Sequence, residues 1–277
     1  MVAPVVWWGA AAGYAAAVGA LYALQDRLVF PAHATPEPSR RLPTGAAHWQ
    51  VEVARDVVVR GVHLRPAAGA GESVALGFGG NCHNAQDLAV FLHERLPAHH
   101  VVVFHYRGYA PSQGRASERA LCEDAEILFD ETLARLGGRP SVALGFSLGS
   151  GVAAHLAANR PLQGAVLVTP FDSVLAVGSK RYWWAPVRPL LRHRFDSQAK
   201  LRESAVPVAV LAAGRDRVVP PERTRELLAG LARPVFHRTF GAADHRSIYD
   251  EPDFDAALRA AVDSVQLAAN GAYAAAS

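Results

Sequence analysis

A chain of 277 residues, 51% of them hydrophobic, is long enough for one large α/β domain with a full core. Its net charge is +3, and its basic residues are mostly scattered arginines, which argues against a nucleic-acid-binding protein. The twelve histidines and two cysteines show neither a metal-binding spacing nor a disulfide framework, so neither a metal nor a cofactor is expected. Cys82 and Cys122 are predicted to be small buried residues.

The chain opens with a segment, residues 2–25, that contains no charged side chain and is rich in alanine. It is long enough to cross a bilayer once as a helix. Aromatic residues near its ends are typical of membrane interfaces, and they are Trp7, Trp8, Tyr14 and Tyr22. We therefore predict a membrane anchor over residues 1–27 of a single-pass protein in the plasma or inner membrane, with its side left open. A cleaved signal peptide and a buried soluble helix are the alternatives.

A proline-rich linker, residues 28–48, leads into the folded domain. Residues 49–53 and 56–64 alternate apolar and polar side chains, which predicts two antiparallel strands. Six further strands are predicted at 73–78, 100–105, 141–146, 165–169, 208–213 and 235–240. Helical stretches lie between them or close the chain, at 85–96, 117–136, 152–159, 221–231 and 253–267. This alternation predicts a mostly parallel central sheet covered by helices on both faces.

One domain, residues 49–268, accounts for these elements, and a small polar tail, residues 269–277, is expected to fray. The span 172–204 is too long for an ordinary connection after the sixth strand. We interpret it as a small lid of short helices. Its aromatic residues Trp183 and Trp184 are candidates for binding an acyl or lipid-like substrate met at the bilayer, or they pack the lid onto the body.

The most informative motif is G-x-S-x-G, formed by Gly145, Ser147 and Gly149 between a predicted strand and a predicted helix. In this setting the serine lies at a strained turn with its hydroxyl exposed, so Ser147 is the candidate nucleophile. The amide of Leu148, at the start of the helix, is free to donate a hydrogen bond to an anion.

A serine nucleophile needs a base and an acid that orients the base. Asp216 follows the strand at 208–213, and His245 follows the last strand in a glycine-led loop, so they are the candidate acid and base. Asp172 is an alternative acid, whereas Asp244 is expected to cap a turn. Two other histidines near strand ends, His83 and His105, are interpreted as structural.

A second donor for the oxyanion is expected from the loop at residues 79–82, where the N–H of Asn81 is the candidate. A plain glycine turn is the alternative there.

The chain resembles the α/β-hydrolase superfamily of serine hydrolases, and within it the Bem46/ABHD13-like branch. The motifs that carry the resemblance span roughly residues 49–267 and are GGNCHN at 79–84, YRGYAPSQG at 106–114, GFSLGSG at 145–151, TPFDS at 169–173, AGRDRVVP at 213–220 and ADH at 243–245. The resemblance implies Ser147 as nucleophile, Asp216 as acid, His245 as base and the 79–82 loop as oxyanion donor. It also implies an N-terminal membrane anchor.

Two positions depart from the pattern of that branch. Gly79 stands where the family usually has a histidine that braces the oxyanion loop, and Ala110 stands where it has a glycine. The first departure suggests a looser loop, whereas the second implies nothing chemical.

These observations together predict a membrane-anchored serine hydrolase that cleaves an acyl ester or thioester through an acyl-enzyme. The alternatives are a catalytically silent protein that uses the same fold for binding, and a serine peptidase or acyltransferase. The oligomeric state is left open.

Overall fold

The structure is a computed structural model that describes the backbone of residues 3–67 and 71–276. Side chains are described within 8–67 and 71–271. Residues 1 and 2 and the side chain of Trp7, which belong to the predicted anchor, lie outside the described residues. So does Ser277, the last residue of the predicted tail.

A single eight-stranded sheet forms the centre of the fold, with strand order β1-β2-β4-β3-β5-β6-β7-β8. The first two strands pair antiparallel with each other and β2 pairs antiparallel with β4, whereas all other neighbours are parallel. The strands are β1 (Ala47–Ala54), β2 (Val57–Leu64), β3 (Val74–Phe78), β4 (His100–Phe104), β5 (Ser141–Phe146), β6 (Gly164–Val168), β7 (Val208–Ala213) and β8 (Pro234–Phe240). All eight predicted strands are present, and the predicted mostly parallel sheet is confirmed.

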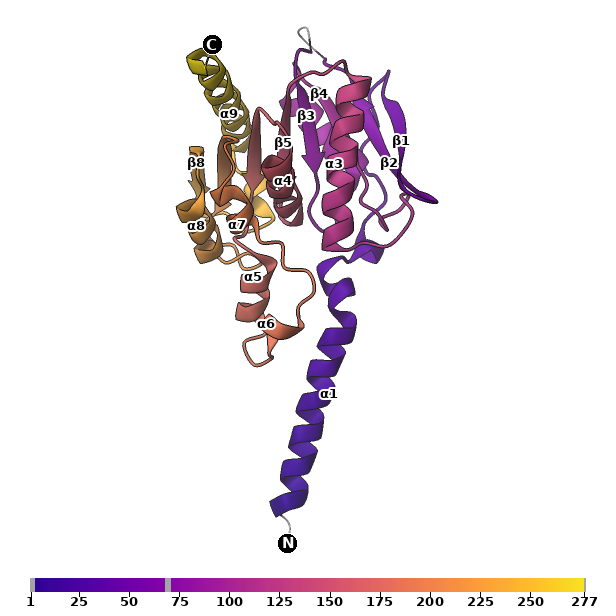
Figure 1. The fold of residues 1–277 in the computed structure, drawn as a ribbon, viewed down its shortest axis with the longest axis vertical. Helices are drawn as coiled ribbons and strands as arrows, with labels where there is room; N and C mark the ends of the chain where they lie inside the picture. Colours follow the sequence, from indigo (N-terminus) through magenta and orange to yellow (C-terminus); the bar gives the residue numbers. More distant parts are fainter. Residues whose placement is uncertain (1–2, 68–70, 277) are drawn as a thin grey trace.

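Helices cover both faces of this sheet (Figure 1). One face packs against α3 (Glu118–Arg135), α4 (Leu148–Asn159), α7 (Ser197–Arg202) and α8 (Pro221–Gly230). The other packs against α2 (Ala85–Arg95) and α9 (Phe254–Ala276). Successive side chains of a strand point to opposite faces, so in β5 Val142 and Leu144 join one core and Ala143 the other. All three are fully buried, as expected for strands covered on both sides.

The last helix is longer than the sequence analysis predicted, because α9 continues to Ala276 instead of ending near Leu267. Alanine dominates its final turns and has the highest helix propensity of any residue. The prediction of a frayed tail over residues 269–277 therefore gave too little weight to the helix propensity of alanine.

The span after β6 contains three short helices, as predicted for residues 172–204. They are α5 (Val174–Arg181), α6 (Val187–Leu190) and α7. Leu201 of α7 is buried in the main core, so this helix belongs to the body of the domain. Only α5 and α6 lie beyond the end of the sheet, beside the N-terminal helix (Figure 1).

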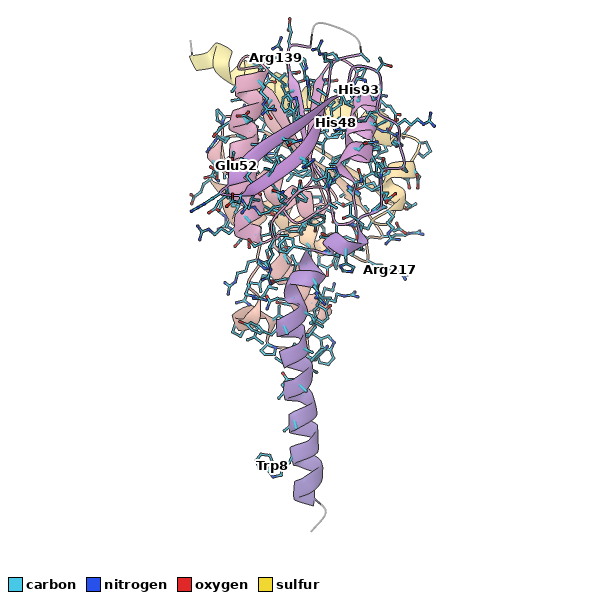
Figure 2. All side chains as sticks on the ribbon, turned by 90° about the vertical axis from the view of Figure 1, so that its right-hand side faces the viewer. Trp8, His48, Glu52, His93, Arg139 and Arg217 are labelled. Atoms are coloured by element: carbon cyan, nitrogen blue, oxygen red, sulfur yellow. The ribbon has the colours of Figure 1, made fainter. Side chains whose placement is uncertain are left out.

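The N-terminal helix α1 (Ala3–Val29) projects from the domain, and Trp8 lies far from the body of the protein (Figure 2). Nowhere in the described chain is there a helix with both the length and the apolar character needed to cross a bilayer. The predicted membrane-spanning anchor over residues 1–27 is therefore not supported. Alanine and glycine make up much of α1, and Gln25, Asp26 and Arg27 lie near its end.

The C-terminal end of α1 is attached to the domain by polar contacts around Asp26. This carboxylate accepts a hydrogen bond from Arg115 (2.5 Å) and pairs with Arg192 (2.9 Å) and His193 (3.1 Å). Burial raises the pKa of Asp26, but the hydrogen bonds from His193 and Arg115 and the charge of Arg192 outweigh this and hold the pKa below its usual 3.8. Buried Gln25 contributes further, because its Oε1 accepts the N–H of Arg192 at 2.8 Å.

The close packing of α9 on the sheet makes Gly164 of β6 intolerant of a side chain. A Cβ built at Gly164 would lie 2.2 Å from the Cβ of Val265. We expect Gly164→Ala to lower the free energy of unfolding by about 1–3 kcal/mol, the usual cost of overpacking. Thermal unfolding should show a melting temperature several degrees below that of the wild type.

The matched control for this prediction is Gly13→Ala on the exposed part of α1, where a Cβ would meet no atom within 4 Å. It should leave the melting temperature unchanged or slightly raised, since alanine favours helix. Equal melting temperatures for Gly164→Ala and the wild type would contradict the packing described.

Candidate active site

Ser147 lies at a strained turn between the end of β5 and the start of α4. Its φ of 50° and ψ of −115° are unusual for a residue with a side chain, and such strain costs on the order of 1–3 kcal/mol. Glycines on both sides of the serine allow close backbone approach: a Cβ at Gly145 would lie 2.5 Å from the carbonyl oxygen of Gly149, and a Cβ at Gly149 would lie 2.1 Å from the carbonyl oxygen of Phe78, at the end of β3. Two hydrogen bonds fix the turn, from the Ser147 N–H to Val168 O (2.9 Å) and from the Ser150 hydroxyl to Ser147 O (2.6 Å).

His245 connects the serine with a buried carboxylate. Its Nε2 lies 2.9 Å from Oγ of Ser147, and its Nδ1 lies 2.6 Å from Oδ2 of Asp216. An ionised carboxylate only accepts hydrogen bonds, so Nδ1 carries a proton and Nε2 is left to accept the serine hydroxyl. The other oxygen of Asp216 accepts the N–H groups of Val218 and Val219, both at 2.8 Å. The carboxylate is therefore held in place and only its Oδ2 faces the histidine.

These three side chains come from the carboxyl ends of three parallel strands, β5, β7 and β8, as the order of the motifs in the sequence predicts. Because parallel strands end at the same edge of a sheet, residues far apart in the chain meet there. The structure brings Ser147, Asp216 and His245 into one hydrogen-bonded line.

The alternative acids have other partners. Asp172 pairs with Arg223 at 2.9 Å and accepts the N–H of Ser173 at 2.7 Å. Asp244 accepts the N–H groups of Arg246 and Ser247, both at 2.9 Å, which is the turn-capping arrangement expected of it.

The loop after β3 runs directly past the serine. A Cβ at Gly80 would lie 3.0 Å from Cβ of Ser147. Asn81 and Leu148 line the same cavity as Ser147. Among the described residues neither of their backbone N–H groups donates a hydrogen bond, so both are available to a ligand. The Asn81 side chain donates instead to the carbonyl oxygen of Val29, at the end of α1, at 3.1 Å.

Two further residues hold this loop: Tyr106, to which the sequence analysis gave no role of its own, and His83, which it interpreted as structural. The hydroxyl of Tyr106 donates to Gly79 O at 2.8 Å, and Nδ1 of His83 accepts the N–H of Gly80 at 3.2 Å. The sequence signal for His83 was its place just after the loop, within the GGNCHN motif at 79–84. His105, the other histidine interpreted as structural, is also buried enough that its pKa falls to about 4.

A cavity of about 490 Å³ opens from the serine, and its lining is mostly apolar. One wall is α1, the opposite wall is α5 and α6, and residues 217–219 complete the rim. The α1 side chains that line it include Val18, Leu21 and Tyr22, so the sequence analysis missed α1 as part of the site. No periodic pattern in α1 indicated which partner it would pack against.

Trp183 and Trp184 do not line this cavity. The Trp183 side chain is 82% exposed, and Trp184 packs edge-on against Tyr14 of α1, with its carbonyl accepting the tyrosine hydroxyl at 3.1 Å. Their neighbour Tyr182 lines the cavity instead. The aromatic pair therefore contacts α1 and solvent, and we no longer assign it to substrate.

The cysteine prediction was right for one residue and wrong for the other. Cys122 is buried, and burial raises the pKa of its thiol to about 11. Cys82 is exposed, and its backbone adopts a positive φ of 66°. In the described ranges, no three His, Cys, Asp or Glu side chains gather as metal ligands would.

Comparison with known proteins identifies similar chains. A sequence model of the alpha/beta hydrolase fold matches residues 76–197. An uncharacterised protein of Mycobacterium tuberculosis is 34% identical over 229 residues, which cover 77% of this chain and 78% of that protein. Lysophosphatidylserine lipase ABHD12 of Macaca fascicularis is 30% identical over 190 residues, covering 58% of this chain but only 48% of the lipase.

Among solved structures, an esterase of Pyrococcus furiosus is similar with a TM-score of 0.64 and 16% identity, covering 83% of this chain and 96% of its own. A proline iminopeptidase-related protein of Thermus thermophilus gives a TM-score of 0.63 at 20% identity, covering 80% and 99%. At these identities the likeness concerns the fold alone.

The short contact between His245 and Asp216 predicts a far-downfield proton resonance in the NMR spectrum. A proton in a charge-assisted hydrogen bond of 2.6 Å is strongly deshielded. Asp216→Asn should abolish the resonance, because the amide removes the charged acceptor and favours the wrong histidine tautomer.

Asp172→Asn is the matched control, since Asp172 is bound to Arg223 and not to His245. It should leave the resonance in place. Loss of the resonance in the Asp172 variant alone would show that the pairing described here is wrong.

Proposed function

Because this chain belongs to the α/β-hydrolase family, we propose that it is a serine hydrolase that cleaves an ester-type bond, an oxygen ester or thioester, in a substrate with an acyl chain. The observation that carries the proposal is the hydrogen-bonded line from Asp216 through His245 to Ser147 at the mouth of an apolar cavity. The narrower assignment to the Bem46/ABHD13-like branch stays a prediction.

The geometry supports a two-step mechanism. As Oγ of Ser147 bonds to the carbonyl carbon, Nε2 of His245 takes its proton, and Asp216 stabilises the imidazolium without becoming protonated. The carbonyl oxygen becomes an oxyanion that accepts the N–H groups of Asn81 and Leu148. When the intermediate collapses, the leaving oxygen or sulfur takes the proton from His245 and the acyl group stays on Ser147. Water then attacks the acyl-enzyme by the same route and releases the acid.

The shape of the cavity supports the proposed substrate class. Val29 lies next to Asn81, and Val18 lines the cavity eleven residues earlier on α1. At 1.5 Å per residue, the apolar wall extends about 16 Å along the helix from the site. We propose that an acyl chain lies along this wall and that α5 and α6 act as the lid. Similarity to a protein named a lysophosphatidylserine lipase also supports a single-chain acyl ester as the substrate.

The first prediction of this proposal concerns Ser147. Wild-type protein should react with a fluorophosphonate probe and hydrolyse acyl esters, whereas Ser147→Ala should lose labelling and about a thousandfold or more of kcat. Gel fluorescence and an ester assay measure these effects. A catalytically silent binding protein, the principal alternative, would show neither reaction, or the same reaction in both proteins.

The second prediction concerns the acyl-chain wall. Leu21 lines the cavity about 12 Å along α1 from Val29, so Leu21→Trp should shorten the space available to the chain. We expect kcat/KM for long-chain esters to fall about tenfold, the value of roughly two buried methylene groups. Short-chain esters should be hydrolysed within about twofold of the wild-type rate.

Leu24→Trp provides the matched control, because Leu24 is the same residue type on the same helix but faces solvent, 45% exposed. It should leave the chain-length profile unchanged. An equal fall in kcat/KM for long-chain esters in both variants would contradict the proposed path of the acyl chain. So would a fall in kcat/KM for short-chain esters alone.

A further inference from the structure

The ring of His83 occupies an aromatic pocket beneath the loop that passes Ser147. Its centroid lies 6.1 Å from that of Phe146 and 6.1 Å from that of Tyr249. The ring does not touch Ser147 or Asp216 through a hydrogen bond. Its Nδ1 faces the loop and accepts the N–H of Gly80 at 3.2 Å.

The two peptide planes before Asn81 are held by three hydrogen bonds. The plane between Gly79 and Gly80 is fixed at both ends, because Gly79 O accepts the Tyr106 hydroxyl and the Gly80 N–H donates to the His83 ring. The next plane is fixed at its carbonyl, because Gly80 O accepts the backbone N–H of His83 at 3.2 Å. His83 therefore contacts both planes, one through its side chain and one through its backbone.

The orientation of the Asn81 N–H follows from these contacts. In a planar trans peptide, the carbonyl and the following N–H point in opposite directions. Since Gly80 O points toward the backbone of His83, the N–H of Asn81 points away from it. Asn81 lines the cavity together with Ser147, and its N–H donates to no group in the described chain, so it is free to donate to a substrate carbonyl.

We propose that His83 is the positioning residue of the oxyanion loop: its ring accepts the Gly80 N–H and thereby fixes the Asn81 N–H toward the substrate oxygen. This inference rests on the proposed hydrolase function and adds to it a residue that never touches the substrate. The loop that the sequence analysis expected to be loose is thus braced by a histidine located after it.

The steric environment of Gly79 supports this assignment. A Cβ at Gly79 would lie 3.0 Å from Cβ of His83 and 3.5 Å from Leu88. A side chain at residue 79 and the imidazole of His83 therefore compete for the same space. The resemblance described above implies a bracing histidine at residue 79, and in this chain the space beside Gly79 is filled by His83.

The protonation state of the ring is also suitable for this role. Burial lowers the pKa of His83 to about 4, and the nearby His245 acts in the same direction. The ring is therefore neutral at the pH where esters are assayed. A neutral imidazole that accepts at Nδ1 carries its proton on Nε2, which leaves one lone pair for the Gly80 N–H.

Two substitutions distinguish the role of His83 as a hydrogen-bond acceptor from its role in packing. His83→Asn keeps an acceptor, because Oδ1 of asparagine is the same number of bonds from Cα as Nδ1 of histidine, but it empties part of the aromatic pocket. His83→Phe keeps a ring against Phe146 and Tyr249 but removes the acceptor. We expect kcat of the asparagine variant within about threefold of wild type, and kcat of the phenylalanine variant reduced at least tenfold. KM for the same ester should change less than threefold in both.

A purely structural role for His83 would give the reverse order, with the phenylalanine variant more active and more stable than the asparagine variant. That order, or wild-type kcat in the phenylalanine variant, would overturn the proposal. If the phenylalanine variant does not fold, His83→Leu replaces it, because leucine also lacks an acceptor. We then expect kcat of the leucine variant to be lower than kcat of the asparagine variant.

A second measurement examines the oxyanion site directly. An alkylboronic acid forms a tetrahedral adduct with a serine nucleophile, so its inhibition constant should rise in the phenylalanine variant in proportion to the fall in kcat/KM. An unchanged inhibition constant would contradict a role at the oxyanion. Phe91→Leu is the control, because Phe91 packs on Phe146 and Tyr249 but not on the loop. It should lower the melting temperature and leave kcat unchanged.

The failure of this inference is distinguishable from the failure of the proposed function. If wild-type protein hydrolyses esters and Ser147→Ala does not, the hydrolase proposal stands, and the ranking of the His83 variants decides the inference alone. If wild-type protein and Ser147→Ala behave alike, both proposals are overturned.

Discussion

The close approach of β3, β5 and α4 at one point is the constraint on which the rest of the structure depends. Ser147 adopts a positive φ only because the strand must turn into the helix within a single residue. No side chain fits between the helix and the end of β3, since a Cβ at Gly149 would overlap the Phe78 carbonyl. The two cores on either side of the sheet supply the packing that offsets this strain.

That constraint also explains why the polar residues converge. The strands β5, β6, β7 and β8 follow one another in the sheet and run parallel, so the ends of β7 and β8 lie at the same sheet edge as the serine and can bring a carboxylate and an imidazole to it. Asp216 is anchored by two backbone N–H groups, and this anchoring leaves a single oxygen for His245. Asp172, which follows β6, instead pairs with Arg223 of α8, so it connects the start of the span after β6 with that helix.

Much of the sheet and of the hydrogen-bonded line could be predicted from the sequence, because both depend on local patterns. Buried strands appear as short apolar runs, and a strand-turn-helix motif identifies Ser147 without knowledge of any long-range contact. The contribution of α1 to the cavity could not be predicted, because its partners α5 and α6 are more than 140 residues away and its composition resembles that of a membrane segment. The exposure of Trp183 and the contact of His83 with the loop at 79–82 could likewise not be predicted, because both depend on how loops are placed relative to one another.

Because α1 is attached to the domain from outside, the hydrogen-bonded line and one wall of the cavity come from different parts of the chain. The sheet and the hydrogen-bonded line lie after residue 46, whereas one wall of the cavity is contributed by a helix that joins the domain through Gln25, Asp26 and Val29. Chimaeras that exchange this helix between relatives can therefore alter the shape of the cavity without changing Ser147, His245 or Asp216. For the same reason, a protein expressed without the helix has a cavity that lacks one wall, and ligand binding measured on it describes a differently shaped site.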